Sequence, residues 1–220
     1  MPKLSIDPAL KQKCTRVALG LVTANVKVHE NSASLLDEMQ RRESEILALS
    51  DPRSILESPK ILATRSGYKA LGKDPARYRG SAEALIRRII SGKHFPQINT
   101  VVDIINLMSV ETRLSIGLYD LAHVKGDITF RVGRAGETYK GIGKYDLNLE
   151  DLAVFSDDDG PHGSPTSDSE RTMVTLTTTH VAAILISFGG PEALQPACER
   201  TASLFTQYAE GENSQIEVVQ

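Results

Sequence analysis

Tryptophan is absent from this chain of 220 residues, only 5% of the residues are aromatic, and there are two cysteines. A cofactor pocket built on stacked indoles is therefore excluded. Cys14 and Cys198 form no local metal or redox motif, which favours a reducing, cytoplasmic setting. No apolar run approaches the roughly 18 residues that a membrane span requires, and residues 1–13 lack the apolar stretch of a signal peptide. We therefore expect no membrane partner.

Several chemical motifs are also missing. The five histidines show no metal-ligand spacing, and the consecutive Asp157, Asp158 and Asp159 do not match the alternating ligands of a calcium loop. There is neither a glycine-rich phosphate-binding loop nor a nucleophile elbow. We expect no metal and no cofactor. The net charge of −3 argues against a protein that coats nucleic acid non-specifically, so no DNA partner is expected.

The remaining composition is that of a globular domain, with 40% hydrophobic and 24% charged residues. Sequence patterns predict helices at 34–49, 64–71, 81–91, 99–110, 180–188 and 191–209. They predict strands at 15–28, 115–119, 127–132, 138–142, 152–155 and 172–178, with a hairpin joining 127–132 to 138–142 and a polar loop at 156–171. Because these elements lack a strict βαβ rhythm, we expect an α+β fold with layered mixed or antiparallel sheets and packed helices. We expect one domain over 1–210 and a disordered tail at 211–220.

The helix predicted at 99–110 is apolar on most of its circumference, which is typical of a helix buried in a core. Asp103 and Asn106 interrupt the apolar run three residues apart and therefore share a face. Polar groups on a buried helix must find partners or line a cavity.

This helix opens a longer pattern that resembles the B3/4 domain of the phenylalanyl-tRNA synthetase beta chain. In that family a stretch N-x-V-V-D-x-x-N is followed by a turn, by F-D-L-D and by G-D-I, which leads into a strand. Weaker similarity runs over about 60–190. The matching residues here are Asn99, Val101, Val102, Asp103, Asn106, Tyr119, Asp120, Leu121, Gly126, Asp127 and Ile128.

The resemblance implies a cleft that proofreads mischarged tRNA by hydrolysing the ester between a wrong amino acid and its tRNA. A Thr-Asn pair, a His and a Glu are associated with that cleft. Here Asn106 matches the Asn, whereas Ile105 replaces the Thr, Gly117 replaces the His, and the Glu position lies near Thr177. We expect Asn106, Gly117 and Thr177 to contact a substrate, with Gly117 enlarging the pocket.

A polar wall could be rebuilt by the hydroxyls and carboxylates at 163–172. Asp168 and Glu170 are the candidate catalytic residues, because a carboxylate can position an attacking water. Thr166, Ser169 and Arg171 are candidate substrate contacts, and we expect part of 163–171 to share one cavity with Asn106. The structural alternative is also open, since such residues commonly satisfy local backbone groups.

The segment 60–93 is strongly basic, with nine cationic residues against Asp74 and Glu83. Tyr68 and Tyr78 lie among these charges and could stack on bases. The alternative is a solvated helical face. Our candidate RNA contacts are Arg65, Lys69, Arg77, Arg79, Arg87 and Arg88.

Three functions remain open. The chain could bind aminoacyl-tRNA and hydrolyse its ester as a trans-editing enzyme, or it could be a non-catalytic module that binds an amino-acid-like ligand or RNA. A third hypothesis is an enzyme that acts on another small amino-acid-like substrate, with Asp168 and Glu170 as acid and base. Kinship of fold alone does not choose between them.

Overall fold

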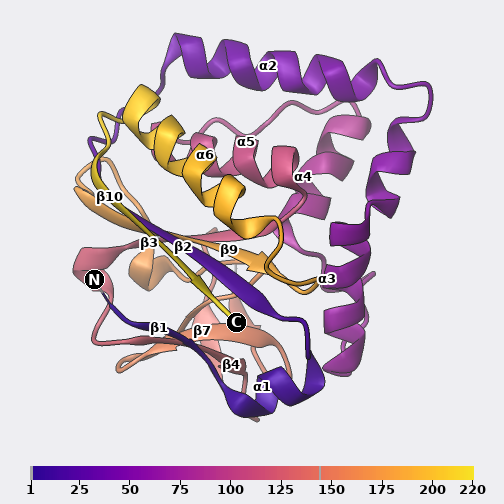
Figure 1. Cartoon of the computed structure of the whole chain (residues 1–220), viewed down its shortest axis with the longest axis vertical. Helices are drawn as coiled ribbons and strands as arrows, with labels where there is room; N and C mark the ends of the chain where they lie inside the picture. The colour runs from indigo at the N-terminus through magenta and orange to yellow at the C-terminus, as the bar shows by residue number, and fades with distance from the viewer. Residues whose placement is uncertain (1, 144) are drawn as a thin grey trace.

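A four-stranded antiparallel sheet lies between a layer of helices and a second sheet (Figure 1). The structure is a computed structural model that describes residues 2–143 and 145–220. The first sheet has the order β10 (Glu212–Val219), β2 (Ala18–Asn25), β9 (His180–Ser187) and β3 (Ser115–Asp120). The second sheet has the order β1 (Leu4–Ile6), β4 (Ile128–Val132), β7 (Ala153–Asp157) and β8 (Gly160–Gly163), with β1 parallel to β4 and the other neighbours antiparallel. A separate hairpin pairs β5 (Thr138–Lys140) with β6 (Asp146–Asn148), and the α+β fold is confirmed.

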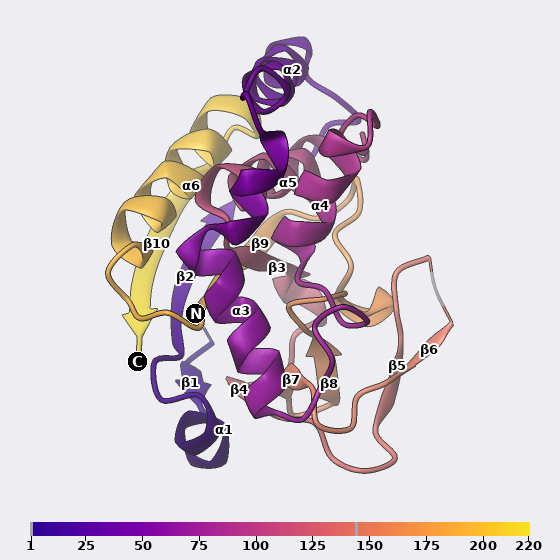
Figure 2. The same ribbon diagram turned by 90° about the vertical axis from the view of Figure 1, so that its right-hand side faces the viewer.

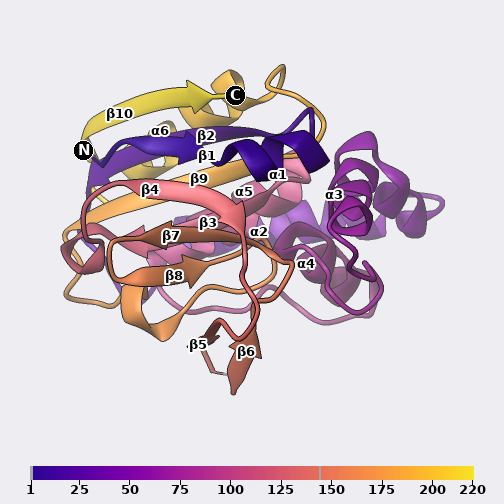
Figure 3. The ribbon, with the colours of Figure 1, turned by 90° about the horizontal axis from the view of Figure 1, so that it is seen from below.

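The helices cover the outer face of the first sheet and one side of the molecule. α2 (Ala33–Leu47), α4 (Ser81–Ile90), α5 (Thr100–Thr112) and α6 (Leu194–Tyr208) form the upper layer, and α3 (Pro59–Ala70) runs along the side (Figure 2). α1 (Pro8–Lys13) lies beside the second sheet, which crosses below the first sheet (Figure 3). Short 3₁₀ turns form η1 (Pro52–Glu57), η2 (Leu121–His123) and η3 (Glu170–Thr172). Among the described residues, no helix is long and apolar enough to cross a membrane.

The first sheet separates two hydrophobic cores. Ile116 and Leu118 of β3 pack with α5 in the helix-side core. Tyr119 packs with Phe155 and Ile184 in the core between the sheets. Successive side chains of a strand point to opposite faces, so α5 and the Tyr119 ring lie on opposite sides of β3.

The predicted helix at 180–188 is wrong, because this segment forms β9, a central strand between β2 and β3. Every β9 residue after His180 is buried. A strand buried on both faces is apolar throughout and shows no period of two, so periodicity cannot distinguish it from a buried helix. The same burial on both faces was predicted for 15–28 and is found in β2.

The predicted tail at 211–220 is not disordered, since it forms the edge strand β10 against β2. Its side chains are exposed or half-buried, which is why the sequence looks polar, and its backbone pairs with β2 from Leu19 to Asn25. Ile216 and Val218 pack against the helix-side core.

Three other predictions around the second sheet are wrong. Residues 127–142 form no hairpin, because β4 pairs with β1 and β7 whereas β5 pairs with β6. The loop predicted at 156–171 contains β8 and part of η3. Residues 172–178 form no strand, since the Thr178 hydroxyl accepts a hydrogen bond from Thr175 N (2.9 Å) and so closes a local turn.

Candidate functional site

The segment 163–169 lies at the free edge of β3 and is fixed there by Asp168. One carboxylate oxygen of Asp168 accepts a hydrogen bond from Leu118 N (3.3 Å), and the other accepts one from the Tyr119 hydroxyl (3.0 Å). Two further buried tyrosines bind the same segment. The Tyr68 and Thr166 hydroxyls are 2.5 Å apart, and the Tyr139 hydroxyl donates to the Ser167 carbonyl (2.5 Å).

Tyr119 fills the space in which the resemblance implies a ligand. A Cβ atom added to Gly117 would lie 2.1 Å from the Tyr119 hydroxyl oxygen, and a Cβ added to Gly163 would also lie 2.1 Å from it. Both positions must be glycine for the ring to lie there. The prediction that Gly117 enlarges a substrate pocket is therefore wrong, because the room it leaves is taken by a side chain of the same chain. Burial and the nearby Asp168 charge raise the pKa of Tyr119 well above its ordinary value, so the phenol is neutral.

The candidate catalytic carboxylates are both engaged. Asp168 holds β3, as described above. Glu170 pairs with Lys140 on β5 at 2.9 Å. Both carboxylates are therefore held by partners distant in the chain, and not by the local backbone groups of the structural alternative.

Arg171 also has a structural role instead of the predicted contact with a ligand. Its guanidinium binds both carboxylate oxygens of Asp157 (2.8 and 3.0 Å) and the carbonyls of His123 (3.0 Å) and Gly160 (3.2 Å). The Asp157 side chain is completely buried. Burial alone would raise the pKa of this carboxyl, but the hydrogen bond from Arg171 and the other interactions bring the pKa below its ordinary value.

Asn106, Ser169 and Thr177 do not complete a common site. Asn106 lies half-buried on α5, across the first sheet from Tyr119 and its Asp168 partner, so the predicted shared cavity is not formed. Ser169 is buried, and its hydroxyl has no hydrogen-bond partner among the described residues. The Thr177 hydroxyl is exposed and lies 3.0 Å from that of Thr175.

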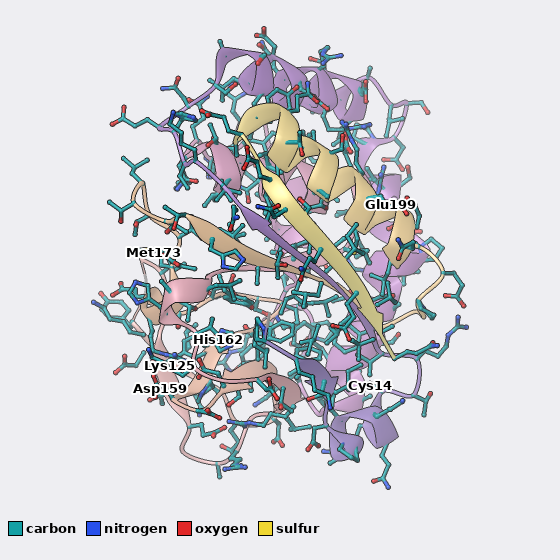
Figure 4. The ribbon with its side chains drawn as sticks, turned by 60° about the vertical axis from the view of Figure 1, so that its left-hand side comes forward. Cys14, Lys125, Asp159, His162, Met173 and Glu199 are labelled. Carbon is teal, nitrogen blue, oxygen red and sulfur yellow. The ribbon has the colours of Figure 1, made fainter. Side chains whose placement is uncertain are left out.

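Two buried polar residues, His162 and Glu43, are not among the site residues predicted from the sequence. His162 is fully buried beneath Tyr119, with the ring centroids 4.5 Å apart, and neither ring nitrogen has a hydrogen-bond partner among the described residues (Figure 4). Burial lowers the pKa of His162 to about 4. Glu43 is buried on the inner face of α2 and accepts a hydrogen bond from Phe95 N (2.5 Å). Its position in the stripe of Leu35, Met39 and Ile46 could have signalled this burial.

The basic segment contains an ion cluster that joins α3 to α4. Arg65 on α3 binds Glu83 on α4 through two hydrogen bonds of 2.9 Å, and Arg87 adds a third of 2.7 Å. Glu83 is buried, and these two arginines bring the pKa of its carboxyl below the ordinary value although burial opposes this shift. The acidic residue at the centre of the segment is therefore neutralised and ties α3 to α4.

Around this ion cluster the cations reach solvent. The prediction that Arg77, Arg79, Arg87 and Arg88 are exposed is confirmed. Tyr78 lies beneath two cations, since Lys73 Nζ is 5.4 Å and the Arg77 guanidinium carbon 5.8 Å from the ring centroid. α3 and α4 face the same side of the molecule (Figure 2). We call the following residues the basic surface: Lys69, Lys73, Arg77, Arg79, Arg87 and Arg88.

Comparisons with known proteins agree with the resemblance. The family model described as the B3/4 domain matches residues 63–210. The phenylalanine–tRNA ligase beta subunit of Paramagnetospirillum magneticum is 37% identical over 65 residues, which are 29% of this chain and 8% of that protein. An N-terminal fragment of the phenylalanyl-tRNA synthetase beta subunit from Pyrococcus horikoshii shares the fold, with a TM-score of 0.51 and 14% identity over 99% of this chain and 50% of that one. The chain thus spans a small part of the curated relative and half of the solved fragment.

Proposed function

The chain belongs to the B3/4 domain family, and from this premise we propose that it binds tRNA through the basic surface without hydrolysing an aminoacyl ester. The observation that carries the proposal is the group of cations around Tyr78, the half-buried Lys73 and the exposed Arg77 and Arg79, on a chain whose net charge is −3. The related synthetase subunit is named for its tRNA, and a cytoplasmic location would suit this partner.

The basic surface offers two kinds of contact to RNA. Exposed arginines and lysines can bind phosphates and release counterions. Tyr78 is half-buried beneath Lys73 and Arg77, so its ring is held in place by neighbours that themselves attract phosphate. Aromatic rings held in this way provide a stacking surface for unpaired bases.

The non-catalytic alternative is favoured over ester hydrolysis because of the state of the cleft. A hydrolase needs a positioned water and donors aimed at the oxyanion. Here Tyr119 fills the space beside Gly117 and Gly163, and its hydroxyl donates to Asp168. Arg171, which could have held an anionic group, is engaged by Asp157 and two carbonyls.

The proposal is tested by measuring tRNA affinity as salt is raised. Fluorescence anisotropy of end-labelled tRNA should show binding that falls between about 50 and 200 mM salt. The triple variant Lys73→Ala, Arg77→Ala, Arg79→Ala should bind more weakly. Its log–log salt slope should be smaller by up to about 2.7, because each lost phosphate contact in a duplex region removes about 0.9.

A matched control removes three exposed cations elsewhere: Lys11→Ala, Lys125→Ala and Arg134→Ala. Both triple variants change the net charge equally, so equal losses of affinity would show that only overall charge matters and would overturn the proposal. A separate deacylation assay with mischarged tRNAs should show no acceleration of ester loss. Acceleration that Asp168→Asn abolishes would establish the hydrolase instead.

A further inference from the structure

A pocket that takes no part in the candidate site lies between α2 and the segment that joins α4 to α5. Its volume is about 240 Å³, which suits a small ligand. Leu36, Met39 and Phe95 provide apolar walls. The remaining lining residues are polar: Gln40, Glu43, His94 and Gln97.

Glu43 is the notable group in this lining. The residue is only 7% exposed. One carboxylate oxygen accepts a hydrogen bond from Phe95 N (2.5 Å), and the other shares a hydrogen bond with His94 Nδ1 (2.8 Å). A carboxylate oxygen can accept two hydrogen bonds, so each retains capacity for another donor.

No permanent cation balances Glu43. Among the described residues, no lysine or arginine nitrogen lies within 4 Å of its oxygens, and its only ion-pair partner is His94. The neighbouring Arg42 binds Glu45 (2.6 Å) and Glu111 (3.0 Å) instead. A buried carboxylate without a cation is costly, and a pocket beside it gives a cation the room to bind.

His94 is a partner that can move aside. Its side chain is 83% exposed, so moving it away from Glu43 would uncover no core. Its main chain is held separately, because Arg88 Nε donates to the His94 carbonyl (2.5 Å). Donors from a ligand could therefore take the place of the imidazole without disturbing the loop.

We propose that this pocket binds a small primary amine, with its ammonium on Glu43 and a short apolar group against Leu36, Met39 and Phe95. A free carboxylate on the ligand is disfavoured, because no lysine or arginine lines the pocket. The proposal does not depend on RNA binding, since none of these residues belongs to the basic surface.

The test uses isoamylamine as the probe and the full chain labelled with ¹⁵N. Titration should shift the Phe95 amide resonance saturably, because this N–H donates to Glu43, with a Kd of about 1 mM. That affinity lies within the ceiling for a ligand of about six non-hydrogen atoms. Isoamyl alcohol and 4-methylpentanoate have the same apolar group without the positive charge, and both should bind at least about tenfold more weakly, a difference of about 1.4 kcal/mol.

Two variants separate binding from folding. Glu43→Gln keeps the side-chain volume and an acceptor for Phe95 N, and should weaken amine binding at least about tenfold. Asp37→Asn, an exposed position on the same helix, is the matched control and should leave binding unchanged. If Glu43→Gln does not fold, Gln40→Trp at an exposed position of the lining should block the pocket instead.

The proposal is overturned if the Phe95 resonance shows no saturable shift with the amine. It is equally overturned if the alcohol binds as tightly as the amine, or if the folded Glu43→Gln or Gln40→Trp variant binds like the parent. tRNA binding by Glu43→Gln should match that of the parent, so a failure of this proposal and a failure of the RNA proposal give different results.

Discussion

His162 should make the protein lose stability in mild acid. The pKa of the buried imidazole is about 4 in the folded protein because burial disfavours its charged form, whereas an exposed histidine has a pKa near 6.5. Between pH 6.5 and pH 4 His162 is protonated in the unfolded chain but neutral in the folded protein. The stability that this neutral histidine contributes is therefore present above pH 6.5 and is lost as the pH falls toward 4.

The loss can be estimated from the two pKa values. Integrating proton uptake between pH 7 and pH 5 gives a decrease of about 2 kcal/mol in the free energy of unfolding, and the full loss below pH 4 is about 3 kcal/mol. Asp103 opposes this change. It is buried on α5, and burial raises its pKa to about 6. The folded state therefore takes up a proton at Asp103 in the same range, which offsets the loss by about 1 kcal/mol.

The effect is best measured on an Asp103→Asn background, in which the opposing carboxyl no longer titrates. Urea unfolding gives the decrease in the free energy of unfolding between pH 7 and pH 5. This decrease should be about 2 kcal/mol larger in the Asp103→Asn protein than in the Asp103→Asn, His162→Leu protein. The other histidines and carboxyls are common to both proteins, so their contributions cancel. If His162→Leu leaves the pH dependence unchanged, the buried imidazole does not titrate as the structure indicates and the reasoning is refuted.

Three further predictions test the packing around the filled cleft and the sheet edge. Gly117→Ala should destabilise the protein by about 1–3 kcal/mol in urea unfolding, because its Cβ would lie 2.1 Å from the Tyr119 hydroxyl; a neutral effect would mean that the cleft has room for a ligand. Arg171→Gln should cost about 3–5 kcal/mol in the same assay, since it leaves the buried Asp157 without its cation; a loss below about 1 kcal/mol would show that Asp157 is solvated. Truncation after Glu210 should expose the edge of β2 and cause association that rises with protein concentration in light scattering, whereas a stable monomer would show that β10 protects nothing.

The sequence predicted the elements whose pattern arises locally. α5 begins after Asn99, whose side chain accepts a hydrogen bond from Val102 N (3.0 Å), and this cap and the apolar run that follows are both visible in the sequence. The apolar spacing of residues 81–91 likewise predicts α4, whose N-cap is Gly80 and has no side-chain cap hydrogen bond. β9 and β10 could not be assigned in this way. β9 shows no apolar–polar alternation, because both its faces are buried. β10 depends on pairing with β2, which lies almost 200 residues away in the chain.

The candidate site shows the same division between local and tertiary information. The exposure of Arg77 and Arg79 follows from their place in a polar loop and was predicted. The role of Gly117 depends on Tyr119 and on Gly163 of another sheet, and only the tertiary structure shows that these glycines make room for the ring. Arg171 and Asp168 have the chemistry of ligand-binding groups, and the partners that bind their side chains lie 11 or more residues away along the chain.

The central claim, that RNA lies on the basic surface, is tested most directly by photocrosslinking tRNA that carries 4-thiouridine and identifying the modified peptides by mass spectrometry. Adducts are expected at Tyr78 and within 69–93, and the Lys73→Ala, Arg77→Ala, Arg79→Ala variant should lose them. Adducts confined to the second sheet or to α6, and unchanged in that variant, would contradict it.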